Sequence, residues 1–98
     1  MSSEKEILLS ATNKANKREL SFEEAKDIVS KYPQSHRAHS LLAFLYLQKR
    51  EFEKVIEQIK ESLKYGKSVT AFNLSAQANI KLKNNEAAKA DYLSALEL

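Results

Sequence analysis

A 33-residue repeat is the feature that most limits what this chain can fold into. Residues 43–62 and residues 76–95 share a pattern of small and apolar positions, with each position repeated 33 residues later. The repeated pairs are Ala43 and Ala76, Tyr46 and Asn79, Val55 and Ala88, Ile59 and Tyr92, and Ser62 and Ala95. A repeat of this length is typical of stacked supersecondary units, each of which buries its apolar face only against its neighbours. Such stacks bind partners over extended surfaces, so the repeat indicates an interaction protein.

Composition indicates that the repeated units are helical. The 98 residues, of which 43% are hydrophobic and 30% charged, suit one globular domain with a single core. One glycine and one proline are too few for the tight turns of an all-β or α/β fold. We therefore expect a single all-α domain over residues 1–98.

Helical periodicity runs nearly from end to end, and its breaks divide the chain into six helices. Ser3 with Glu6 and Ser21 with Glu24 form the Ser-x-x-Glu pattern of a capping box, which marks a helix start. Pro33 ends the second helix, because proline lacks a backbone N–H and disfavours helical geometry in the preceding residue. The expected spans are about 3–15, 21–32, 35–49 and 51–65, then a fifth helix from residue 68 and a sixth from 84 or 85 to 98.

Short links between these helices predict three antiparallel hairpins, over residues 1–34, 35–67 and 68–98. Gly66, directly after the fourth helix, is expected to be a left-handed C-cap.

The hairpins resemble the tetratricopeptide repeat family, whose pattern is W-x2-L-G-x2-Y, then A-x3-F, then proline. The middle hairpin matches at His39, Leu42, Ala43, Tyr46, Val55, Ile59 and Ser62. The third matches at Phe72, Ser75, Ala76, Asn79, Ala88, Tyr92 and Ala95. The first matches only in its second helix, at Ala25, Val29, Tyr32 and Pro33, and is therefore degenerate. The resemblance implies a short right-handed superhelix of stacked hairpins, an α-solenoid.

The pattern assigns small and bulky residues to different places in the hairpins. Small residues are expected where two helices of one hairpin approach most closely, at Ala25, Ala43, Ala76 and Ala88. Bulky residues are expected to fill the hairpin interior, at Leu42, Tyr46, Phe52, Ile59 and Tyr92. The third hairpin departs from the family, since Ser75 and Asn79 stand where leucine and tyrosine are usual.

The resemblance also implies a binding face, because in this family the first helices of successive hairpins line a concave groove. The groove residues carried over to this chain are Arg37, Ser40, Leu41, Phe44 and Gln48, then Thr70, Asn73, Leu74, Gln77 and Lys81. Both sets follow the spacing i, i+3, i+4, i+7, i+11, so each forms one helical face.

Two roles are open for the central groove residues. Phe44 is either an anchor for a ligand or extra packing between hairpins. Asn73 and Gln77 either hydrogen-bond the backbone of an extended peptide or are ordinary surface residues. Thr70 and Leu74 occupy slots that are cationic in relatives that grip a terminal carboxylate, so such a clamp is disfavoured. Arg37 and Lys81 leave a preference for acidic segments open.

The residue inventory gives little basis for catalysis, so we expect no enzyme, no cofactor and no metal. Without cysteine there is no thiolate nucleophile and no Cys-ligated zinc. His36 and His39 are the only histidines, and no carboxylate in the same helix completes a metal site. We expect His39 to pack inside its hairpin and His36 to be solvated.

Partner classes other than proteins are disfavoured. The net charge of +3 comes from residues 35–67, where seven basic residues outnumber four acidic ones without forming the dense stripe of a nucleic-acid reader. The longest apolar run, residues 41–47, is too short to span a membrane. With no targeting segment in the sequence, we predict a cytoplasmic protein.

The end of the sequence suggests self-association. No capping helix follows the last hairpin, so Leu93, Leu96 and Leu98 are expected to be exposed, in a homo-oligomer or in a piece of a longer array. The sequence thus predicts a non-catalytic module that holds a peptide or helix of a partner protein in its groove. The alternative is an assembly module that acts through its last helix.

Overall fold

The computed structural model describes residues 3–98, within which the chain forms six α-helices and no β-strand. The helices are α1 (Glu4–Asn16), α2 (Phe22–Lys31), α3 (His36–Gln48), α4 (Phe52–Leu63), α5 (Val69–Lys81) and α6 (Asn85–Leu96). The all-α class is confirmed. None of the helices in this described part of the chain combines the length and apolarity needed to cross a bilayer.

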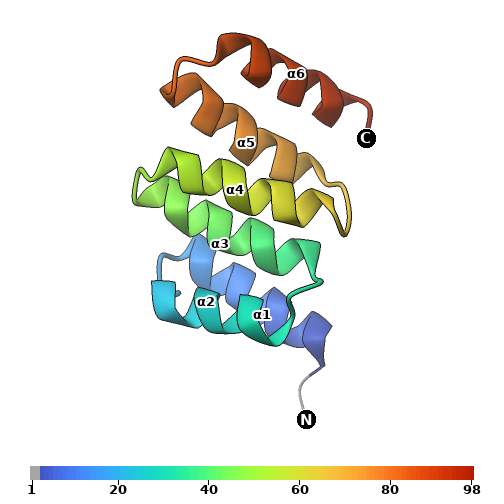
Figure 1. The fold of residues 1–98 in the computed structure, drawn as a ribbon. Coiled ribbons are helices and arrows are strands. Elements are labelled where there is room, and N and C mark those ends of the chain that lie inside the picture. The colour runs from blue at the N-terminus through green and yellow to red at the C-terminus, as the bar shows by residue number, and fades with distance from the viewer. Residues whose placement is uncertain (1–2) are drawn as a thin grey trace.

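The helices follow one another along the long axis of a molecule that measures 44 × 26 × 21 Å (Figure 1). α3 packs along α4 and α5 along α6, while α4 packs against α5 and so joins the two pairs. α1 and α2 both pack on α3 at one end, and α6 forms the other end (Figure 1). Helices that are neighbours in sequence are therefore neighbours in space from α2 onward.

The first helix of each expected hairpin begins in the same way. α1, α3 and α5 are all 13 residues long, and their N-caps are Ser3, Ser35 and Ser68. Each serine hydroxyl accepts a hydrogen bond from the backbone N–H three residues later, at 3.1–3.2 Å. This bond satisfies a donor that the first turn of a helix leaves unpaired.

α2 begins with the reciprocal capping box that its sequence predicts. The Glu24 N–H donates to Ser21 Oγ, and the Ser21 N–H donates to Glu24 Oε1 at 3.2 Å. The pKa of Glu24 lies below its ordinary value. The main cause is the hydrogen bond from the Ser21 backbone N–H, and the second is the hydrogen bond from the Lys14 side chain. The Lys14–Glu24 ion pair also ties α2 to α1, with 3.3 Å between Nζ and Oε2.

The turns after α1, α3 and α5 share one geometry. Each contains a basic residue in the left-handed region, with φ near 60°: Arg18, Arg50 and Lys83. The next N–H reaches back five residues to a helix carbonyl, in the bonds Glu19 to Lys14, Glu51 to Tyr46 and Asn84 to Asn79. This is the Schellman motif, which usually has glycine at the left-handed position.

Gly66 was expected to be such a left-handed cap, and that prediction is wrong. Its φ is not positive. A Cβ at Gly66 would lie 2.5 Å from Cδ2 of His36, so this position is small because the His36 ring packs against it. The expectation that His36 is solvated is wrong for the same reason: the ring is half-buried and its Nδ1 is buried without a hydrogen-bond partner.

The core consists of two clusters. The first joins α1, α2 and α3, and the second joins α3, α4 and α5; Phe44 and Tyr46 pack against both. The small residues expected at close helix approaches are all buried, namely Ala25, Ala43, Ala76 and Ala88.

Tyr92 was expected to fill the interior of the last hairpin, but its side chain is exposed, as 41% of its surface is accessible. The equivalent residue of the preceding hairpin, Ile59, is buried because α5 packs against α4. No helix in the described chain covers α6 in that way.

The contact between Gly66 and His36 can be tested by substitution. Gly66→Ala should lower the free energy of unfolding by about 1–3 kcal/mol, because the added methyl overlaps the imidazole. In a His36→Ala background the same change should cost almost nothing. Urea unfolding followed by circular dichroism measures both costs, and equal costs in the two backgrounds would refute the contact.

Candidate binding groove

A cavity of about 770 Å³ opens between α1, α3 and α5. Its walls are formed by residues of all three helices and of the link before α5. They are Leu8, Leu9, Thr12, Ala15, Asn16, His36, Arg37, Ser40, Leu41, Phe44, Lys67, Ser68, Thr70, Asn73, Leu74 and Gln77. The size is in the range of cavities that bind small molecules or a segment of chain.

Eight of the ten groove residues expected from the sequence line this cavity. They are Arg37, Ser40, Leu41, Phe44, Thr70, Asn73, Leu74 and Gln77. Gln48 and Lys81, at the C-terminal ends of α3 and α5, are exposed and lie outside its walls. The structure thus brings together one face of α3 and the matching face of α5.

The contribution of α1 to the cavity was not predicted from the sequence. Its wall residues are Leu8, Leu9, Thr12, Ala15 and Asn16, which lie on one face of the helix. They do not follow the 33-residue repeat, because α1 is offset by 32 residues from α3, as the N-caps Ser3 and Ser35 show. With that offset, Leu9 and Thr12 correspond to Leu41 and Phe44.

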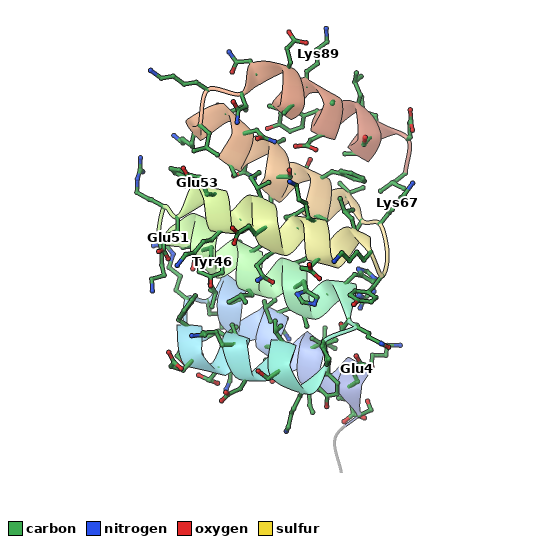
Figure 2. All side chains as sticks on the ribbon, in the orientation of Figure 1. Glu4, Tyr46, Glu51, Glu53, Lys67 and Lys89 are labelled. Carbon is green, nitrogen blue, oxygen red and sulfur yellow. The ribbon has the colours of Figure 1, made fainter. Side chains whose placement is uncertain are left out.

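The floor of the cavity is apolar, and one end is cationic. Leu8, Leu41 and Leu74 are buried and give one leucine from each helix. Arg37 is exposed in the first turn of α3. Lys67 is exposed in the link between α4 and α5, just before α5 begins (Figure 2). The walls, which belong to the described part of the chain, contain no carboxylate.

Phe44 has the packing role, while its role as an anchor for a ligand stays a prediction. Its ring is half-buried, packs against both core clusters and also lines the cavity. Its removal would therefore disturb the fold as well as the groove.

Ser40 is part of the groove wall but its hydroxyl is already bonded. Its Oγ lies 3.0 Å from Ser62 Oγ, and Ser62 Oγ donates to the carbonyl of His36 at 2.8 Å. Both serines are buried. Because Ser62 donates to the carbonyl, the Ser40 hydroxyl must donate to Ser62. This chain fixes α3 against α4 and leaves Ser40 little to offer a ligand.

His39 packs inside the middle hairpin, as expected. Its ring is buried, Nε2 lies 2.7 Å from the carbonyl of Pro33, and Nδ1 lies 2.9 Å from the side-chain amide of Gln58. These bonds hold α3 to α4 and to the link between α2 and α3. Within residues 3–98 no three His, Asp or Glu side chains converge as metal ligands.

Ser75 and Asn79 of α5, which differ from the tetratricopeptide pattern, form a polar cluster with Asp91 of α6. Ser75 Oγ donates to Asp91 Oδ2 at 2.7 Å, and Asn79 Nδ2 donates to the same oxygen at 2.9 Å. Ser75 and Asn79 are buried between α5 and α6, away from the cavity walls. This cluster therefore holds α5 against α6.

Comparisons with known proteins give no match. No protein-family model, no curated protein sequence and no solved structure matches the chain.

The serine chain beneath the groove gives a second testable prediction. Ser62→Ala should lower the free energy of unfolding by about 1–3 kcal/mol, because it leaves the buried Ser40 hydroxyl without its acceptor and removes the side-chain bond to the His36 carbonyl. Ser40→Ala should cost less, since Ser62 keeps its bond to His36. The double variant should cost no more than Ser62→Ala alone, as measured by thermal and urea unfolding; additive costs would contradict the chain of bonds. Ser10→Ala, at an exposed position on α1, is the control.

Proposed function

We propose that this protein is a non-catalytic interaction module of the tetratricopeptide kind, which holds a segment of a partner protein in the groove between α1, α3 and α5. The observation that carries the proposal is that residues 33 apart line one cavity. The pairs are Arg37 and Thr70, Ser40 and Asn73, Leu41 and Leu74, and Phe44 and Gln77. Stacked helical repeats present such extended concave surfaces to their partners.

The chemistry of the walls suits an extended peptide or a helix better than a small polar molecule. Three buried leucines provide an apolar floor for side chains of the partner. The amides of Asn16, Asn73 and Gln77 stand along the groove and can exchange hydrogen bonds with a peptide backbone. Each such bond contributes about 0.5–1.5 kcal/mol net, so several together with the apolar contacts give useful affinity with loose sequence selectivity.

The cationic end gives the groove a direction. Arg37 and Lys67 stand at one end, while Asn16 and Gln77 belong to the later turns of their helices. A partner with acidic residues before or after an apolar stretch would be oriented by that charge. The cytoplasmic location remains a prediction from the sequence.

The groove can be tested with peptides selected from a displayed library of random sequences against the immobilised chain. Peptides that bind should lose about tenfold or more in affinity for Asn73→Ala/Gln77→Ala, because two polar contacts are removed. Neither substitution removes a core side chain, so the circular dichroism spectrum and melting temperature should stay close to those of the original chain.

The matched control is Glu57→Ala/Lys60→Ala, at two exposed positions on α4 that do not line the cavity. This variant should bind the selected peptides as the original chain does, as measured by fluorescence polarisation. Failure of the selection to return any binding peptide would overturn the proposal, as would equal affinity for both double variants.

A further inference from the structure

Exposed leucines lie on α6 and just beyond its end, on a face that also carries the charged residues Glu86 and Lys89. Leu93, Leu96 and Leu98 have 52%, 82% and 59% of their surface accessible. In a helical projection Leu93 lies opposite Ala88 and Asp91, which face α5. Lys89 also points away from the rest of the molecule at this end (Figure 2). Leu93 is therefore the centre of the surface that α6 presents to solvent.

Comparison with α4 shows which part of this face is unusual. In the 33-residue register, Leu96 corresponds to Leu63, which is half-buried and packs in the second core cluster beside α5. Leu93 corresponds to Lys60, which is exposed on α4. Suppose that a further helix packed on α6 in the way that α5 packs on α4. It would cover Leu96 but leave Leu93 exposed to water. Leu93 needs a different partner.

The other end of the molecule does not offer a matching surface. The exposed residues of α2 are charged or polar, namely Glu23, Glu24, Lys26, Asp27, Ser30 and Lys31. On α1 the exposed residues are also polar except Leu9, which lines the groove. Head-to-tail stacking of copies would press the leucines of α6 against charged side chains, so a symmetric contact is favoured.

We propose that two copies of the chain associate through α6, with the two helices antiparallel and the two-fold axis at Leu93. In that register Leu93 meets Leu93 of the second copy, and Leu96 meets Ala90. Lys89 meets Glu97 of the second copy, twice by symmetry. A parallel arrangement would instead bring Lys89 against Lys89 and Glu97 against Glu97. Charge complementarity thus selects the antiparallel pair.

The contact is small, since it involves one helix of 12 residues from each copy. Interfaces well below the standard size belong to weak, reversible complexes. We expect a monomer at low concentration and a dimer at high concentration, with a dissociation constant of roughly 10 µM to 1 mM. The groove between α1, α3 and α5 is on other helices, so the dimer and peptide binding succeed or fail independently.

Sedimentation equilibrium of the 98-residue chain over that concentration range tests the proposal. The average mass should rise from 11.1 kDa toward twice that value. Leu93→Glu should keep the chain monomeric throughout, with an unchanged circular dichroism spectrum because the residue is exposed. Ile80→Glu, which places the same charge on an exposed apolar residue of α5 outside the groove walls, should dimerise as the original chain does.

Charge exchange distinguishes the specific register from general stickiness. Lys89→Glu and Glu97→Lys should each weaken the dimer by several-fold, because each puts like charges opposite one another. The double exchange Lys89→Glu/Glu97→Lys should restore it. A monomer at 1 mM would overturn the proposal, and so would a dimer that Leu93→Glu leaves intact or charge effects that the double exchange does not reverse.

Cross-linking tests the symmetry axis directly, because the chain contains no cysteine. Leu93→Cys should form a disulfide-linked dimer under mild oxidation, since the two positions meet on the axis at a distance that a disulfide can span. Glu57→Cys, exposed on α4, should not cross-link under the same conditions. Equal cross-linking of the two variants would contradict the arrangement.

Discussion

The architecture depends on the close approach of paired helices at alanine side chains. Ala43 is completely buried in the core that α3 shares with α4, and Ala76 is completely buried in α5 at the equivalent position. A larger side chain at either position would push the helices apart, because protein interiors are packed too tightly to absorb it. The spacing of α3 from α4 and of α5 from α6 in turn fixes which faces of α3 and α5 turn toward the groove. The shape of the cavity is thus set by residues that lie outside its walls.

Much of this arrangement follows from local sequence signals. The serine caps at Ser3, Ser21, Ser35 and Ser68 and the stop at Pro33 predict the helix starts and the end of α2 within a residue or two, because each signal acts through one or two backbone bonds. The small residues of the repeat predict the buried contacts, and eight of ten expected groove residues share one cavity.

Other features depend on contacts between residues far apart in sequence and were not predictable in the same way. Gly66 looked like a left-handed cap, but it is small because of a ring 30 residues earlier, while Arg18, Arg50 and Lys83 adopt the left-handed geometry instead. Ser75 and Asn79 differ from the tetratricopeptide pattern, and their role depends on Asp91, which lies 16 and 12 residues later and accepts a hydrogen bond from both. The role of α1 in the groove was hidden by a change of one residue in the repeat length.

The claim that α1, α3 and α5 together form the binding surface is tested most directly by residue-resolved nuclear magnetic resonance. Backbone amide signals of the labelled chain would be followed during titration with a peptide selected for binding. Shifts should concentrate at groove residues of all three helices, such as Thr12, Asn73 and Gln77, and leave the outer faces of α2, α4 and α6 unchanged. Shifts confined to the outer faces of α4 and α6, with a silent α1, would contradict this claim.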